Sequence, residues 1–557
     1  MMCSSTAMKW LAFAATFPSI QVTALSAPQN NSITLDDWSS LSPSPDLRWV
    51  PCFENYTCAR LQVPLDYGNH SRGNTTIAFI KLPAKTVTKD TQSVLVNPGG
   101  PGASGIDAVL SQGIDLAEVV QGKHNVVGFD PRGVGRSGPV VDCWPNHPEG
   151  RAQFERLYYP EISNASSTSL GKQFAAADIF GKACTPTVGG SNGTAAFVTT
   201  PAVSRDMLSF LKAEQAAIER SDSKLWYYGL SYGTVLGATF AHLFPDKVGR
   251  MILDGVIDAE DYYSLGWTSS LYDADRAIAS FIESCFDAGQ PNCSFWGDSV
   301  ENIRSRLDSL LQNLKYNPIP ISPSDTCPLP MLATYSDLKQ LIFQAMYFPL
   351  ERFSNLATIL SSLERGNTTA YAAAVTSGSI SANPCNYDPN GTTSTKDINT
   401  LIRCTDGASI RKFQNISQFE AYVNILNNQS HFFGEVWPNN ANGVACRSLE
   451  VSPPSSGRLS SSILDTRHTA SPILFVTNEV DPVTPKRGAY KMSSVFPGSV
   501  VLTQDLVGHT AFGTGASACV VERIQRYLLQ GELPAANTTC PADFRPFQGQ
   551  SLKRRWP

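Results

Sequence analysis

The part of the sequence that most directly suggests chemistry is a serine between two glycines, in the run Gly-Leu-Ser-Tyr-Gly at residues 229–233. Residues 225–228 predict a buried strand before it, and the residues up to about 243 predict a helix after it. A sharp strand-to-helix turn would expose the serine hydroxyl, and the glycines remove Cβ atoms that would collide there. The helix would also direct its first N–H groups toward developing negative charge. The pattern favours Ser231 as a nucleophile over an ordinary glycine turn.

A serine nucleophile needs a base, and the sequence offers seven histidines. His509 follows the strand predicted at 500–502 and precedes the helix predicted from about 518 to 529, so it can reach back over Ser231. The remaining histidines lie close to or before the nucleophile, in the middle of the chain, or ahead of a late strand: His70, His124, His147, His242, His431 and His468. We therefore predict that His509 is the base.

A third group must orient the imidazole and stabilise its cation. Asp481 follows the strand predicted at 472–477 and lies in a loop stiffened by two prolines. Asp254, after the strand that follows the nucleophile's helix, is the alternative acid. Glu479 and Asp505 are less well placed. Asp481 is the predicted third member.

The reaction also requires donors for the negative charge that develops on the attacked carbonyl oxygen. Losing one such donor typically raises the barrier by about 2.7–4 kcal/mol. The N–H of Tyr232, directly after the nucleophile, is one predicted donor. The strand 93–96 runs into Asn-Pro-Gly-Gly-Pro-Gly at 97–102, where glycine lets the backbone come close. Of the two adjacent glycines, Gly99 and Gly100, we favour Gly100 as the second donor.

The elements that carry these residues alternate between strand and helix. Strands are predicted at 59–63, 75–82, 93–96, 125–130, 225–228, 251–253, 472–477 and 500–502, with a helix from about Thr200. Such alternation implies a mainly parallel sheet with right-handed crossovers. The order Ser, Asp, His along the chain is that of α/β hydrolases. We therefore predict the α/β-hydrolase fold.

The alternation stops in one long stretch of the chain. Residues 258–464 show helical segments and loops without the strand-helix pattern, which predicts an inserted, mostly helical cap domain. The hydrolase core would then comprise 27–257 and 465–557. The 557 residues exceed one ordinary single-core domain, which agrees with such an insertion.

The N-terminus has the features of an export signal at residues 1–26. Lys9 precedes the short apolar stretch 10–17, and small residues follow before position 27. A signal anchor is the alternative, but no later apolar run approaches the roughly 20 residues that span a bilayer. We expect a secreted, extracellular protein that is free of the membrane after cleavage.

Cysteines and glycosylation sequons agree with export. Of 13 cysteines, 12 remain after signal removal, six in the core and six in the insertion. Proximity suggests the pairs Cys52–Cys58 and Cys519–Cys540. We expect N-linked glycans, because the chain has twelve Asn-x-Ser/Thr sequons, at Asn30, Asn55, Asn69, Asn74, Asn164, Asn192, Asn292, Asn367, Asn390, Asn415, Asn428 and Asn537.

The composition excludes some classes of function. Hydrophobic residues make up 42% of the chain and charged residues 16%, which is typical of a globular protein. The net charge is −5, and the single dense basic run is at 553–555, so no nucleic-acid partner is expected. The glycine loop at 97–102 lacks the Lys-Ser/Thr ending of a phosphate-binding P-loop. No metal or cofactor is required by the predicted residues.

Four motifs together resemble one branch of the α/β hydrolases. They are Asn-Pro-Gly-Gly-Pro-Gly-Ala-Ser-Gly at 97–105, Gly-Phe-Asp-Pro-Arg-Gly-Val-Gly-Arg-Ser at 128–137, Gly-Leu-Ser-Tyr-Gly-Thr at 229–234 and Asp-Pro-Val-Thr-Pro at 481–485. The chain from about residue 60 is similar to the tripeptidyl aminopeptidases, relatives of the prolyl aminopeptidases. Prolyl-type relatives usually have His where this chain has Pro98, which favours the tripeptidyl branch.

The resemblance implies a helical cap and removal of short peptides or single residues from free N-termini. A substrate ammonium group would need a carboxylate in the cap, and the sequence does not choose among Glu260, Asp261, Asp406 and Glu435. Asp406 belongs to a Cys-x-Asp element that resembles one of the branch. Leu449 stands where relatives often have Trp.

Three hypotheses follow for the activity. The first is a serine exopeptidase that works through an acyl-enzyme on a peptide substrate. The second keeps the same catalytic residues but acts on a small metabolite as an esterase or lactonase. The third is a binding protein without catalysis, which the joint presence of Ser231, Asp481 and His509 disfavours.

Overall fold

The computed structural model describes residues 38, 40–159, 161–218, 222–323, 330–375, 395–408, 410, 413–441 and 443–548. The predicted signal segment 1–26 lies outside these residues. Within them, no helix combines the length and the apolar character that a membrane crossing requires.

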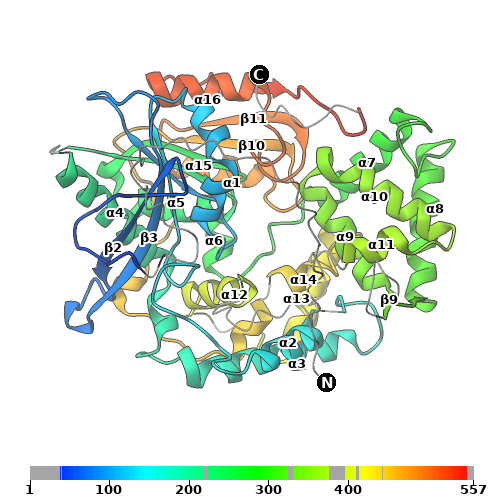
Figure 1. Ribbon diagram of the computed structural model, residues 1–557. Coiled ribbons are helices and arrows are strands. Elements are labelled where there is room, and N and C mark those ends of the chain that lie inside the picture. The colour runs from blue at the N-terminus through cyan, green and yellow to red at the C-terminus, as the bar shows by residue number, and fades with distance from the viewer. Residues whose placement is uncertain are drawn as a thin grey trace, which may run out of the picture.

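A ten-stranded sheet forms the framework of the α/β core. The first strands pair antiparallel, and every pairing from the fourth strand of the sheet onward is parallel, as predicted. In spatial order the strands are β1 (Val50–Cys52), β2 (Tyr56–Pro64), β3 (Asn74–Leu82), β5 (Asn125–Phe129), β4 (Ser93–Asn97), β6 (Leu225–Leu230), β7 (Val248–Asp254), β10 (Leu474–Val480), β11 (Val500–Val507) and β12 (Thr539–Pro541). The sheet lies on the side of the molecule where β2, β3, β10 and β11 are labelled in Figure 1.

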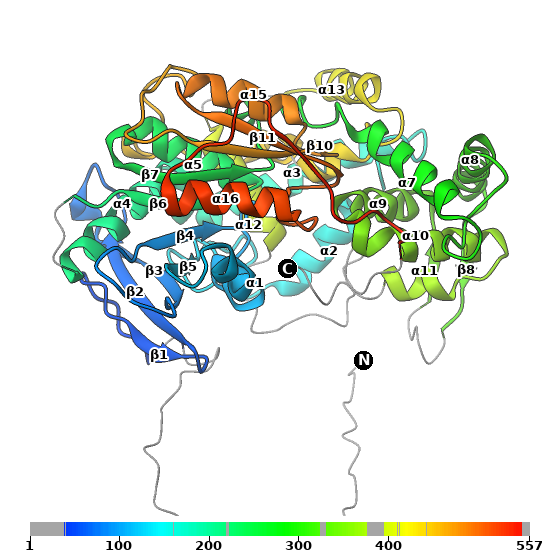
Figure 2. The same ribbon diagram turned by 90° about the horizontal axis from the view of Figure 1, so that it is seen from above.

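Helices cover both faces of this sheet, as Figure 2 shows. Helices α1 (Gly105–Val119) and α16 (Ala518–Gln530) pack on one face, and α4 (Thr200–Ala217), α5 (Tyr232–Leu243) and α15 (Lys486–Val495) on the other. Successive strand residues point to opposite faces. Val94 and Val96 of β4 therefore join the core beneath α1, whereas Leu95 between them joins the opposite core. Because both faces are buried, these strands are almost continuously apolar.

The chain leaves the sheet between β7 and β10 and forms helices there. Helices α7 to α11 make a lobe at one end of the molecule (Figure 1). The helices are α6 (Ala259–Tyr263), α7 (Ala274–Ala288), α8 (Val300–Tyr316), α9 (Tyr335–Tyr347), α10 (Pro349–Glu364), α11 (Thr369–Ala374), α12 (Thr395–Asp406), α13 (Ile416–Gln429) and α14 (Trp437–Ala441), with one small hairpin, β8 (Ile319–Ile321) and β9 (Met331–Ala333). This is a mostly helical cap inserted in an α/β core.

A second helical segment, which the strand-helix pattern of the sequence did not indicate, contributes to the cap. Helices α2 (Pro148–Tyr158) and α3 (Ser169–Val188) follow β5 and pack on each other. Helix α3 also packs on α13 and on the 3-10 segment Gly443–Ser448, both from the long insertion. The cap is therefore built from two stretches of the chain.

Five disulfide bonds join cysteines that belong to the same part of the fold. Both predicted pairs form, Cys52–Cys58 and Cys519–Cys540, and the other three are Cys143–Cys184, Cys285–Cys293 and Cys404–Cys446. None of these five connects residues 258–464 to the rest of the chain. Cys327 and Cys385 lie outside the described residues.

Candidate active site

Ser231 occupies the tight turn between β6 and α5. Its backbone has φ 55° and ψ −121°, a conformation that L-residues rarely adopt and that recurs at functional sites. The flanking glycines are sterically required. A Cβ on Gly229 would lie 2.3 Å from the carbonyl oxygen of Gly233, and one on Gly233 would lie 2.6 Å from that of Asn97. The turn therefore has the geometry of a nucleophile elbow.

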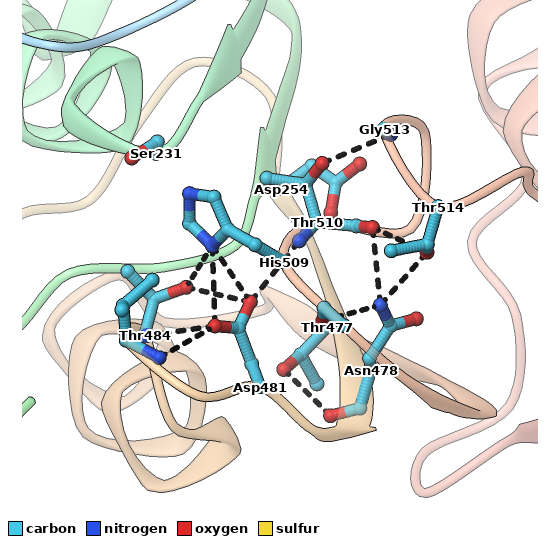
Figure 3. Close-up of polar contacts among 12 residues, drawn as sticks. Ser231, Asp254, Thr477, Asn478, Asp481, Thr484, His509, Thr510, Gly513 and Thr514 are labelled. Atoms are coloured by element: carbon cyan, nitrogen blue, oxygen red, sulfur yellow. Dashed lines mark hydrogen bonds and ion pairs between the residues drawn. The ribbon is translucent and has the colours of Figure 1, made fainter. Parts of the chain in front are cut away.

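His509 and Asp481 are brought together at the ends of β11 and β10. Nδ1 of His509 lies 3.0 Å from Oδ2 and 3.1 Å from Oδ1 of Asp481. Figure 3 shows the imidazole between Asp481 and Ser231, with its other nitrogen on the Ser231 side. His509 is only 7% exposed and Asp481 is fully buried. The arrangement orients the imidazole toward the serine.

Asp481 is held in its ionised form by several donors. It accepts hydrogen bonds from the N–H groups of Val483, Thr484 and Thr510 and from the Thr484 hydroxyl. Burial alone would raise the pKa of Asp481, but the charge of His509 and these hydrogen bonds lower it below its usual value. The carboxylate can therefore stabilise an imidazolium at neutral pH. Thr484, whose Oγ1 is also 3.1 Å from His509 Nδ1, was not recognised from sequence.

The alternative acids do not contact the imidazole of His509. Asp254 accepts hydrogen bonds from the N–H groups of Ala511 and Phe512, so it supports the loop that carries the histidine. Burial raises the pKa of Asp254 to about 6. Glu479 pairs with Lys486 and Arg276, and Asp505 pairs with Arg545. Of the four candidate carboxylates, Asp481 alone forms a hydrogen bond with the imidazole of His509.

The glycine loop after β4 lies directly against the elbow. Gly99 has φ +100° and Gly100 φ +105°, and a Cβ on Gly99 would come within 3.0 Å of both the Ser231 Cβ and the Tyr232 nitrogen. The Gly99 N–H donates to Asn97 Oδ1 at 3.0 Å, so it is occupied. The N–H groups of Gly100 and of Tyr232, the first residue of α5, have no hydrogen-bond partner among the described residues. They are the available donors for an oxyanion.

Cap helix α12 contacts the glycine loop at 97–102, called the oxyanion loop below, and also contacts Thr200 and Tyr262. Asn399 donates to the Pro101 carbonyl at 2.8 Å, and Arg403 donates to the Gly100 carbonyl at 3.4 Å. Asp406, at the end of the helix, accepts from the Thr200 N–H at 2.7 Å and from the Tyr262 hydroxyl at 2.8 Å. Burial raises the pKa of Asp406 to about 7, against the lowering effect of these hydrogen bonds.

The four cap carboxylates that are candidates for binding a substrate ammonium group all have partners within the chain. Glu260 pairs with Lys491 at 2.8 Å, and Glu435 pairs with Lys339 at 3.1 Å. Asp261 accepts hydrogen bonds from the N–H and hydroxyl of Ser269, and Asp406 is bonded as described above. Apart from the local Asp261–Ser269 bonds, these contacts join distant parts of the chain, which the sequence alone does not indicate.

Comparison with known proteins agrees with this architecture. Residues 92–317 match the alpha/beta hydrolase fold family, and residues 430–540 match the family of TAP-like proteins. Serine protease Hip1 of Mycobacterium tuberculosis is 28% identical over 518 residues, covering 89% of this chain and 91% of that protein. The tripeptidyl aminopeptidase of Streptomyces coelicolor is 26% identical over 516 residues, covering 89% and 86%. Carboxylesterase B of M. tuberculosis is 25% identical over 498 residues, covering 87% and 86%.

The strand order, the strained serine turn and the matched segments define this chain as an α/β hydrolase. Within that superfamily, residues 430–540 match the family of TAP-like proteins, and the chain is similar along nearly its whole length to a tripeptidyl aminopeptidase. The family expected from the four sequence motifs is therefore confirmed.

Proposed function

We propose that this protein is a secreted serine exopeptidase that releases short peptides, tripeptides in particular, from free N-termini. The observation that carries the proposal is the His509–Asp481 pair facing the elbow serine, beside two N–H groups that have no partner among the residues the structure describes. The similarity to a serine protease and a tripeptidyl aminopeptidase supports peptide hydrolysis.

In the proposed mechanism, Ser231 attacks the acyl carbon while His509 takes its proton at Nε2. Asp481 stabilises the imidazolium, and the N–H groups of Tyr232 and Gly100 hold the oxyanion. His509 then protonates the leaving amine, so that the peptide bond breaks and an acyl-enzyme remains. His509 next removes a proton from a water molecule that attacks the ester, which releases the acid and restores the serine.

Export and glycosylation belong to the same proposal. All ten sequon asparagines within the described residues are solvent-exposed, and ten of the twelve mature cysteines are paired. Both observations support an extracellular protein with N-linked glycans.

Digestion of a defined peptide library, followed by mass spectrometry, tests the peptidase. Successive loss of three residues from free N-termini is expected, and N-acetylated copies of the same peptides should resist. Loss of one residue at a time would indicate a prolyl-type enzyme instead. Intact peptides after exposure to protein that still hydrolyses p-nitrophenyl esters would contradict the proposal.

An esterase acting on a small acyl substrate is the second candidate function. The similarity to carboxylesterase B favours it, as does the finding that the four candidate cap carboxylates already have partners. The relative kcat/KM for aminoacyl arylamides and p-nitrophenyl esters, measured on one preparation, separates the two functions.

A further inference from the structure

Arg403 is a buried cation on the cap helix α12, next to the oxyanion loop. Its side chain is 8% exposed, and its guanidinium lies 4.2 Å from the centre of the Trp267 ring. The following residue, Cys404, is tied to Cys446 by a disulfide, which fixes the helix to the segment Gly443–Ser448. The disulfide and the Trp267 ring therefore both restrain the position of the guanidinium.

The two edges of this guanidinium are bonded very differently. Nη1 donates to the carbonyls of Asn440 at 2.7 Å and Ala441 at 2.9 Å, so that edge is saturated. On the other edge, Nε is buried and has no hydrogen-bond partner in the described part of the chain, and Nη2 has the long contact of 3.4 Å to the Gly100 carbonyl. The Nε–Nη2 edge is one that binds carboxylates with two parallel hydrogen bonds.

Arg132 shows that the Nε–Nη2 edge of another buried arginine in this chain is bonded to a carboxylate. Among the described residues, Arg132 and Arg403 are the two arginines with less than a tenth of their surface exposed. Arg132 donates from Nε and Nη2 to the two carboxylate oxygens of Asp206, at 2.5 and 2.7 Å. No carboxylate of the described chain forms an ion pair with Arg403. An unpaired buried charge is costly, and an anionic ligand would remove that cost.

The location of Arg403 specifies where such a ligand would lie. The carbonyl that it contacts belongs to Gly100, whose N–H is the proposed oxyanion donor. An extended peptide advances about 3.3–3.6 Å per residue, so a side chain within one or two residues of the cleaved bond can reach this edge. Burial lowers the pKa of Arg403 to about 10, so the group stays charged at neutral pH.

We propose that the Nε–Nη2 edge of Arg403 binds a carboxylate of the substrate, so that the enzyme prefers an acidic residue beside the cleaved bond. This specificity rests on the proposed hydrolysis at Ser231 but not on the substrate being a peptide. The other contacts of the Arg403 guanidinium, with the Trp267 ring and with the carbonyls of Asn440 and Ala441, then hold it in position for the substrate.

The test compares charged and neutral substrates of the same shape. Free-N-terminal tripeptide arylamides that end in Glu or Gln form one pair, and peptides with Glu or Gln after the cleaved bond form another. The half-ester p-nitrophenyl hydrogen glutarate and its neutral monoamide form the third. The wild-type kcat/KM should favour the acid by roughly ten- to a hundredfold in at least one pair, the range for a charged hydrogen-bonded contact.

Three variants assign that preference to Arg403. Arg403→Gln should reduce the acid-to-amide ratio to about one, and Arg403→Lys should keep part of it. Arg447→Gln is the matched control, because Arg447 is also a cap arginine stacked on an aromatic ring with an unpartnered Nε, but it pairs with Asp178 on α3. It should keep the wild-type ratio. The ratio does not depend on how much of each variant is correctly folded.

The outcomes distinguish failure of this site from failure of the peptidase. Cleavage of peptides with an acid-to-amide ratio near one in all pairs would overturn the anion site and leave the peptidase standing. An acid preference confined to the esters, with no peptide cleaved, would support the site and refute the peptidase. Loss of rate in Arg403→Gln without any change in the ratio would make Arg403 purely structural and overturn the proposal.

Discussion

At the scale of single residues, the proposed catalysis depends on the pairing of Asp481 with His509. The hydrogen bonds that Asp481 accepts keep it ionised and point Nδ1 of His509 toward it. Asp481→Asn should lower kcat/KM by about 10⁴, because the amide favours the wrong imidazole tautomer. Steady-state kinetics checks this, with Asp505→Asn as the control, since that exposed carboxylate pairs with Arg545. Equal losses in both variants would contradict the assignment.

The buried carboxylate Asp406 predicts a pH dependence of stability. Its folded-state pKa, about 7, is raised above the unfolded value of about 4. Its contribution to stability is therefore fully present below pH 4 and is lost as the pH rises to about 7, by at most about 4 kcal/mol.

Asp406→Asn cannot ionise, so its free energy of unfolding should fall less between pH 4.5 and pH 7.5 than that of the wild type. Urea denaturation at the two pH values measures the difference. Asp505→Asn should behave as the wild type. An unchanged pH dependence in Asp406→Asn would show that this carboxylate does not carry the effect.

At the scale of elements, the oxyanion loop packs so closely against the serine turn that a side chain at the contact would displace one of them. A Cβ on Gly99 would lie 2.5 Å from the Leu230 carbonyl oxygen, and the residue has φ +100°. Gly99→Ala should therefore displace the loop and lower kcat by about 10²–10³, as loss of one oxyanion donor does. Gly73→Ala is the matched control, because Gly73 has φ +83° but open space around it. Nearly full activity in Gly99→Ala would contradict the role of this loop.

Local pattern was sufficient to predict the elements that carry the site. The strands before Ser231 and Asp481 are short, apolar and followed by turn residues, so their ends could be placed to within a few residues. Thr484 and Asp254 were not recognised as supporting residues. Thr484 acts through its hydroxyl, which donates to Asp481, and Asp254 accepts from the backbone N–H of the distant residue Ala511. Helix α3 was missed as part of the cap, since its packing on Gly443–Ser448 joins distant parts of the chain.

At the scale of the whole molecule, the exposed sequons predict extensive N-glycosylation. The ten sequon asparagines in the described chain are exposed on both the core and the cap. Protein secreted from a eukaryotic host should lose mass in several steps on treatment with peptide N-glycosidase, and peptide mapping in heavy-oxygen water should mark the asparagines. An unchanged mass would contradict a glycosylated, exported protein.

The central claim is that Ser231 is the nucleophile of an active hydrolase, and covalent labelling tests it most directly. Native protein is treated with a fluorophosphonate probe, digested and mapped by mass spectrometry. We expect one modified serine, Ser231, and no labelling after Ser231→Ala, whereas Asp505→Asn should be labelled like the wild type. Labelling at another serine, or none in the native glycosylated protein, would contradict the claim.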